Sequence, residues 1–145
     1  MSDVLTKDLV VVSGSARTRE DAIREAGGLL VASGAVTPEY VDAMAERERT
    51  VSTFMGNGLA IPHGTNESKD TIVRSAVSLV RYDEPVDWGG NPVRVVVGIA
   101  GKNDEHLGIL GKIAVVFSDE DEARRVLDAT SVDELYDVLG AVNDD

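Results

Sequence analysis

The sequence contains no cysteine, few aromatic residues and no long apolar run. Without cysteine, disulfide scaffolds, thiolate metal sites and thiol catalysis are excluded. Aromatic residues make up 4% of the chain and apolar residues 43%, so the core must consist mainly of Val, Leu, Ile, Ala and Met. The longest apolar run, residues 93–100, is interrupted by Arg94 and falls well short of the ~20 residues that a membrane-spanning helix needs.

Basic residues are also scarce. Lys and Arg number 14 against 26 Asp and Glu, which gives a net charge of −12. Nucleic acid and anionic membranes are therefore poor partners. The acids are spread along the chain, as on proteins that work in concentrated salt, although an ordinary acidic cytosolic domain has the same pattern. The N-terminal residues lack the basic and apolar regions of a signal peptide, so we expect a soluble, cytoplasmic protein.

The 145 residues suit a single domain spanning residues 1–145, in which strand and helix signals alternate. Residues 9–12 and 71–81 are strand candidates, and residues 82–85 indicate a turn. Asn57-Gly58 is a second turn signal, followed by a short apolar run. Residues 93–99 are apolar on both faces of the expected strand, which predicts a central place in a covered sheet.

Helix start and stop signals lie between and after these strands. Thr18 is placed to cap a helix that Gly34 ends, and Thr37-Pro38 starts a second helix that runs to about Glu48. Three further helices are expected to begin after Asn103, Ser118 and Ser131, the first with an apolar face of Leu107, Leu110, Ile113, Ala114 and Phe117. The pattern predicts an α/β single-domain sandwich, a mixed β-sheet with helices on both faces.

One of the two histidines, His63, follows a short predicted strand in the segment Ile61-Pro62-His63-Gly64. Pro62 fixes one backbone torsion, and Gly64 allows a sharp turn without a side chain beside the imidazole. This pattern is suited to presenting the ring to a large partner. The alternative is a surface histidine in a glycine-rich loop.

The second histidine, His106, falls in the first turn of the helix that Asn103 is expected to cap. The helix dipole there favours a neutral imidazole, and free backbone N–H groups attract phosphate oxygens. A merely solvated histidine is the alternative. Arg47 lies near the end of the second helix in a charged turn, and by itself it indicates only an exposed arginine.

Other chemistries find less support. A metal site could be imagined from His63, His106, Asp104 and Glu105, but the histidines are far apart in the sequence and no HExxH or H-x-E spacing is present. The glycine-rich segment 56–64 lacks the P-loop pattern, and no G-x-S-x-G elbow exists.

The segment Gly56-Asn-Gly-Leu-Ala-Ile-Pro-His-Gly-Thr65 resembles the phosphorylation motif of the fructose/mannitol class of enzyme IIA domains, which belong to the phosphoenolpyruvate-dependent sugar phosphotransferase system. The resemblance extends from about Leu5 to Leu139. It includes residues 40–44 with Arg47-Glu48, residues 67–70, 97–100 and 103–107, and the last predicted helix at 130–135.

This resemblance implies an α/β fold and a phosphoryl carrier. The phosphocarrier protein HPr is then the donor and enzyme IIB the acceptor, and the domain works with a membrane permease without entering the membrane. His63 takes the place of the phosphorylated residue, His106 that of the second active-site histidine and Arg47 that of the active-site arginine. The backbone N–H groups of Gly64 and Asn103 are expected to add phosphoryl-binding donors, and no metal or cofactor is implied.

Some relatives of this family use the phosphorylation state of the same histidine to control binding to target proteins, so a regulatory module is the alternative function. A non-catalytic binder of metal or small anions is a third hypothesis. The resemblance implies that the domain does not touch the sugar, and fructose is preferred over mannitol only because the domain stands alone.

Overall fold

The computed structural model describes residues 4–102 and 105–143, and within these residues five strands form one mixed sheet. Its order is β1-β4-β5-β3-β2. Strands β1 and β4 pair in parallel, as do β3 and β5, whereas β4 with β5 and β2 with β3 are antiparallel. The strands are β1 (Val10–Val11), β2 (Phe54–Gly56), β3 (Leu59–Ala60), β4 (Ala76–Trp88) and β5 (Asn91–Ala100).

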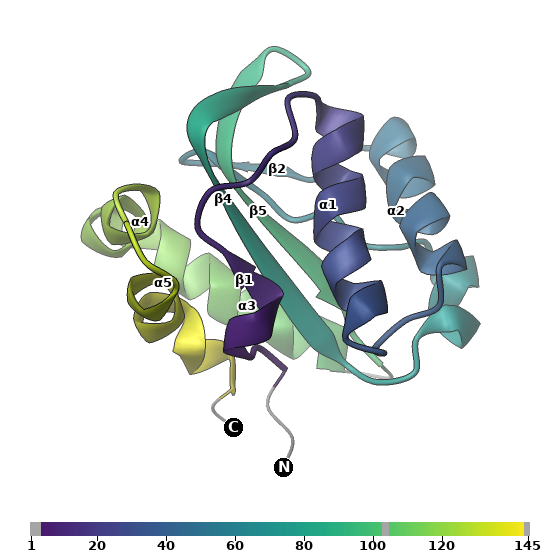
Figure 1. Ribbon diagram of the computed structural model, residues 1–145. Helices are drawn as coiled ribbons and strands as arrows, with labels where there is room; N and C mark the ends of the chain where they lie inside the picture. The colour runs from purple at the N-terminus through teal and green to yellow at the C-terminus, as the bar shows by residue number, and fades with distance from the viewer. Residues whose placement is uncertain (1–3, 103–104, 144–145) are drawn as a thin grey trace.

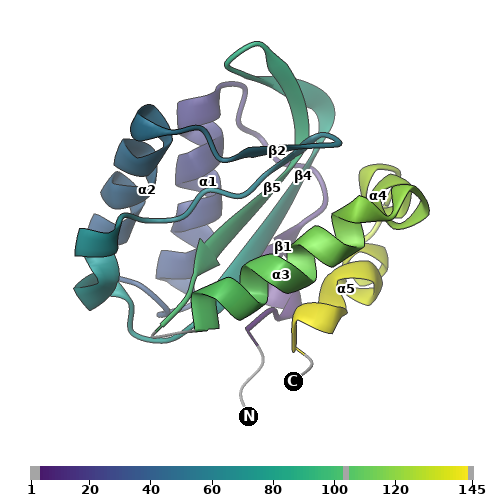
Figure 2. The same ribbon diagram turned by 180° about the vertical axis from the view of Figure 1, so that it is seen from behind.

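Helices cover both faces of this sheet (Figures 1 and 2). On one face lie α1 (Arg19–Ala32) and, beside it, α2 (Glu39–Thr50). On the other lie α3 (Glu105–Ser118), α4 (Glu120–Leu127) and α5 (Val132–Leu139). Short 3₁₀ helices are η1 (Lys7–Leu9), η2 (Asn66–Thr71) and η3 (Gly140–Asn143). The predicted α/β sandwich is confirmed.

Strand β5 is the central strand, and its residues from Val95 to Ala100 are buried on both faces, as predicted. The turn predicted at residues 82–85 is wrong, because these residues continue β4 and the chain reverses at Gly89 and Gly90, both with positive φ. The pairing of β4 with β5 shifts register between Arg81 and Val86. Pro85 is tolerated because it lies within this irregularity, where no regular ladder bond is required of it.

Two of the predicted helix caps are confirmed. The Thr18 side chain accepts a hydrogen bond from the Asp21 N–H, and Ser131 accepts one from Glu134. Gly34 follows α1 with a φ of +82°, a conformation that glycine adopts without strain. The expected strand start at Thr71 is wrong, since that residue ends η2.

Other helix details differ from the prediction. α2 begins at Glu39, with Pro38 rather than Thr37 at the N-terminal capping position, and it continues past Glu48 to Thr50. α4 is capped by Asp119 instead of Ser118, because the Asp119 carboxylate accepts from the free N–H groups of Asp121 and Glu122. Leu107 is 75% exposed, so the buried face of α3 is shifted to Ile109, Ile113, Val116 and Phe117. The cap predicted at Asn103 lies outside the described residues.

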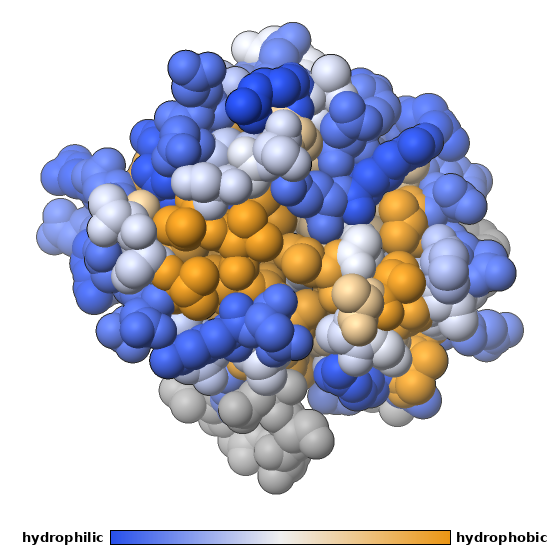
Figure 3. Space-filling view, viewed as in Figure 1, coloured by the Kyte–Doolittle hydropathy of each residue, from blue (hydrophilic) through white to orange (hydrophobic). Residues whose placement is uncertain are grey.

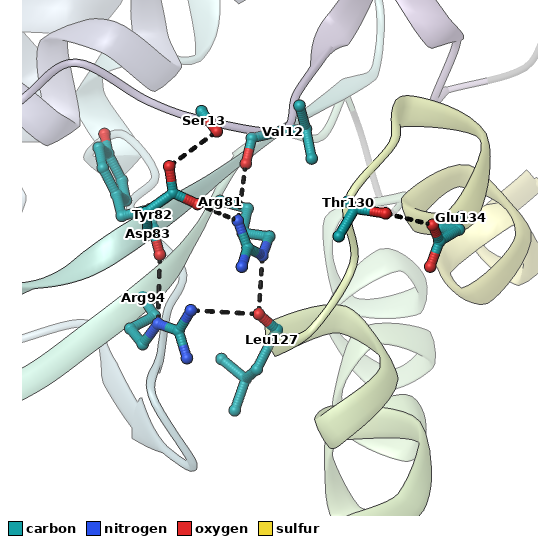
Figure 4. A network of polar contacts seen from close by, with 9 residues as sticks. All are labelled: Val12, Ser13, Arg81, Tyr82, Asp83, Arg94, Leu127, Thr130 and Glu134. Carbon is teal, nitrogen blue, oxygen red and sulfur yellow. Dashed lines mark hydrogen bonds and ion pairs between the residues drawn. The ribbon is translucent and has the colours of Figure 1, made fainter.

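Two arginines tie α4 to the sheet (Figure 4). Arg81 Nε on β4 and Arg94 Nη2 on β5 both donate to the carbonyl of Leu127, the last residue of α4, over 2.7 and 3.3 Å. Positive charge at a helix C-terminus is favourable, because the dipole is negative there. This polar clamp fixes α4 on the face opposite α1.

The face that presents β1 carries a central apolar area bordered by hydrophilic side chains (Figure 3). β1 is an edge strand, and Val11 and the following Val12 are only partly buried. Among the described helices, none combines the length and apolar character needed to span a membrane.

Candidate functional site

The topology of the sheet brings the two histidines together. Because β3 and β5 are parallel, the chain leaves both strands at the same edge. After β3 the chain passes Pro62 to His63, whose backbone still pairs with Ile99. After β5 it enters the first turn of α3, which carries His106. The ring centroids of His63 and His106 lie 5.0 Å apart, edge to face at 60°.

A backbone carbonyl fixes the tautomer of His63. Its Nδ1 lies 2.9 Å from the carbonyl oxygen of Ile61. A carbonyl oxygen can only accept, so Nδ1 carries the hydrogen and Nε2 carries the lone pair. The side chain is half-buried. His63 is thus anchored on one side and presents a nucleophilic nitrogen on the other.

Both imidazoles are held in the neutral form. Burial lowers the pKa of His63, a tendency that the bond to Ile61 partly opposes and the positive charge of Arg47 strengthens. Burial also lowers the pKa of His106, and the positive charges of Lys69 and Arg47, and of His63 when it is protonated, add to the effect. Near pH 7 each ring therefore keeps an unprotonated nitrogen.

Arg47 belongs to the same site. It lies in the last turn of α2, is half-buried, and its Nη1 donates to the carbonyl of Val51 over 2.6 Å. Its charge acts on both imidazoles. The structure thus brings the two histidines together and places the Arg47 charge near both.

Gly64 has a steric role. A Cβ at this position would lie 2.4 Å from Cε1 of Tyr40 and 2.5 Å from Oγ of Ser68. Its N–H already donates to the Tyr40 hydroxyl over 2.9 Å, so the phosphoryl-binding amide predicted here is occupied. Asn103, the other predicted backbone donor, is not among the described residues.

Sequence reasoning missed three residues of this site: Tyr40, Glu48 and Lys69. Glu48 is a buried carboxylate next to Arg47, and Lys69 on η2 is close enough to lower the pKa of His106. The one sequence signal for Tyr40 and Glu48 was their place in the helix that resembles the enzyme IIA family. Across residues 4–102 and 105–143, no group of three His, Cys, Asp or Glu side chains is arranged to hold a metal ion.

The chain belongs to the EIIA 2 family of the phosphoenolpyruvate-dependent sugar phosphotransferase system, whose family model matches residues 3–141. It is similar to the mannitol-specific phosphotransferase enzyme IIA component of Halalkalibacterium halodurans, with 50% identity over 141 residues and 97% of each chain covered.

Two solved structures from Escherichia coli have the same fold. The crystal structure of IIA mannitol has a TM-score of 0.86 and 38% identity, covering 92% of this chain and 97% of that one. The second is the complex of enzyme IIA-mannitol with phosphorylated enzyme IIB-mannitol, with a TM-score of 0.86, 37% identity, and coverage of 92% and 95%.

Proposed function

We propose that the protein is a phosphoryl carrier that accepts a phosphoryl group from HPr on Nε2 of His63 and passes it to enzyme IIB. The observation that carries this proposal is the state of one imidazole. Its Nδ1 is bonded to the Ile61 carbonyl, which leaves the lone pair on Nε2, and a second imidazole and Arg47 lie beside it.

The chemistry follows from this arrangement. His63 Nε2 attacks phosphorus in line, and the new N–P bond forms as the N–P bond to the donor histidine breaks. Negative charge is spread over the three equatorial phosphoryl oxygens in the transition state of such a transfer, so fixed donors and positive charges placed there accelerate it. His106 supplies a hydrogen bond to one of these oxygens. Arg47 and Lys69 supply the positive charge.

The similar proteins support the proposed identities of the phosphoryl acceptor and of the sugar. An enzyme IIA of the same fold is known in a complex with phosphorylated enzyme IIB. The similar curated proteins are named mannitol-specific. We therefore propose mannitol as the sugar, in place of the fructose that the sequence alone favoured, and the cytoplasm as the place of transfer. The donor role of HPr rests on the family resemblance.

Intact-mass measurement tests the carrier role. The protein is incubated with phosphoenolpyruvate, enzyme I and HPr, and we expect the mass of one phosphoryl group to be added. His63→Gln should abolish this addition, and His106→Gln should slow it while leaving binding of HPr nearly unchanged. Phosphorylation of the His63→Gln protein would refute the assignment.

Transfer onward separates the carrier from the regulatory alternative. The phosphorylated protein is mixed with enzyme IIB of a mannitol system and, separately, of a fructose system. Rapid loss of the phosphoryl group to the mannitol protein is the expected result. A protein that is phosphorylated on His63 and passes the group to neither would favour a regulatory module.

A further inference from the structure

The hydrogen-bond ladder between the His63 turn and β5 contains an inserted side chain. His63 pairs with Ile99 in a parallel bridge, and the Ile99 N–H donates to the Pro62 carbonyl over 3.0 Å. In a regular parallel ladder, the next bond would run from the Gly64 N–H to the Ile99 carbonyl. Instead, Gly64 donates to the Tyr40 hydroxyl over 2.9 Å, and that hydroxyl donates to the Ile99 carbonyl over 2.6 Å.

We propose that Tyr40 is a positioning residue for phosphoryl transfer, whose hydroxyl links the His63 turn to β5 and thereby sets the place of the imidazole. This inference rests on the proposed function of His63. One hydroxyl both accepts and donates, so it bridges two backbone groups that would otherwise bond to each other.

The surroundings of Tyr40 make this bridge rigid. The residue is 2% exposed, and burial raises the pKa of its hydroxyl to about 12, so the group keeps the proton that it donates. The ring also contacts the turn directly, because it occupies the space that a Cβ on Gly64 would need. The Tyr40 ring can therefore pack against the turn only because residue 64 has no side chain.

Tyr40 also relates the two sides of the site. It lies in the first turn of α2, and Arg47 lies two turns later on the same face of the helix. The bond from Tyr40 to Ile99 therefore fixes α2 relative to the strand that leads to His106. Loss of the hydroxyl should disturb His63 first and Arg47 second.

Tyr40→Phe is the decisive variant, because it removes the hydroxyl and keeps the ring. We expect kcat for phosphorylation by HPr to fall about 10- to 100-fold with KM nearly unchanged, since a displacement of about 1 Å at a reacting group has an effect of this size. The matched control is Tyr82→Phe. Tyr82 is equally buried and donates to Glu25 over 2.6 Å, away from the histidines, so its loss should leave kcat unchanged.

Nuclear magnetic resonance supplies a readout that does not depend on activity. With only two histidines in the chain, the ring signals of His63 are readily assigned. Tyr40→Phe should shift them and change the pH at which they titrate, and Tyr82→Phe should not. In the wild-type protein, a slowly exchanging Tyr40 hydroxyl proton should lie close to the Gly64 amide proton, a test that requires no variant to fold.

The outcomes distinguish this inference from the proposed function. If wild-type protein is not phosphorylated at all, the carrier role fails, and the resonance experiments still decide whether the hydroxyl sets the ring position. If wild-type and Tyr40→Phe proteins are phosphorylated at the same rate with the same His63 signals, the positioning role of Tyr40 is refuted. A wild-type Tyr40 hydroxyl proton that exchanges freely would also refute it.

Discussion

The indole N–H of Trp88 donates to the buried carboxylate of Glu48, with 2.5 Å between Nε1 and Oε1. The same carboxylate accepts from the Thr53 N–H over 2.8 Å, the Thr53 hydroxyl over 2.6 Å and the Ser52 hydroxyl over 2.9 Å. It joins the end of α2 to the end of β4 and to the segment before β2. Since Arg47 donates to Val51 in this segment, Glu48 also stabilises the position of the Arg47 guanidinium.

Removing this carboxylate should destabilise the fold. Glu48→Ala leaves buried donors of Trp88 and Thr53 without an acceptor, and we expect the free energy of unfolding to fall by about 3 kcal/mol or more. Urea unfolding followed by the fluorescence of Trp88, the one tryptophan in the chain, measures the loss. Glu46→Ala, at an exposed position on the same helix, is the control, with an expected change within about 0.5 kcal/mol. Equal losses in both variants would contradict the prediction.

Gly101 determines how closely β5 approaches α3. A Cβ at Gly101 would lie 2.4 Å from Cα and 2.7 Å from N of His106, so backbone atoms would have to move. We expect Gly101→Ala to lower the free energy of unfolding by about 1–3 kcal/mol and to slow phosphorylation, because His106 is displaced.

The matched glycine variant is at Gly108, on α3. A Cβ on Gly108 has nothing within 4 Å, so Gly108→Ala should raise the free energy of unfolding by about 0.5–1 kcal/mol through helix propensity alone. Thermal or urea unfolding of the two alanine variants gives the comparison. Stabilisation by Gly101→Ala would contradict the close contact between residue 101 and the backbone of His106.

The two histidines should make stability depend on pH. The pKa of each is lowered in the folded protein, so the unfolded chain, with histidine near 6.5, binds protons at a higher pH. Stability is therefore lost as the pH falls through about 6.5, and the loss is complete below the folded pKa values. Urea unfolding between pH 7.5 and 5.5 tests this, and the His63→Gln/His106→Gln protein should have a shallower slope. An identical slope in that protein would contradict the lowered pKa values.

The acidic surface should make the protein more stable in salt. At a net charge of −12, repulsion between carboxylates opposes the compact state. Raising KCl from 0.1 to 1 M shortens the screening length from about 10 to about 3 Å and should raise the unfolding temperature. A variant with the exposed Glu84, Glu120 and Asp121 changed to amides should gain less. Equal gains would indicate that salt acts through another property.

The sequence predicted those parts of the fold that depend on interactions within a few residues, such as helix caps and tight turns. Thr18 and Ser131 cap helices by bonds within their own turn, and Asn57-Gly58 forms the reversal between β2 and β3 with positive φ at both residues. The apolar residues on both faces of β5 correctly predicted that this strand lies at the centre of the sheet. By contrast, Pro85 was predicted to lie in a turn because proline rarely occurs inside a strand. It fits within β4 only because the pairing with β5 shifts register there, and no local pattern in the sequence predicts that shift.

The same distinction applies to the site. His63 and His106 stood out because the chain has only two histidines, each beside glycine or a helix start. Their proximity follows from the parallel pairing of β3 and β5, which no local pattern specifies. Tyr40 and Glu48 act through contacts with residues of other elements, such as Ile99 and Trp88, so their roles became visible only in the folded chain.

The bond from His63 to the Ile61 carbonyl has a consequence for the movement of protons. A carbonyl oxygen does not take up the Nδ1 proton, so in the proposed transfer this proton stays in place as Nε2 bonds to phosphorus, and the loaded ring is cationic. When the group is passed on, the departing ring is a neutral imidazole, which is a good leaving group. Neither loading nor unloading in the proposed transfer then requires a general acid or base, so the same ring can accept the phosphoryl group and release it.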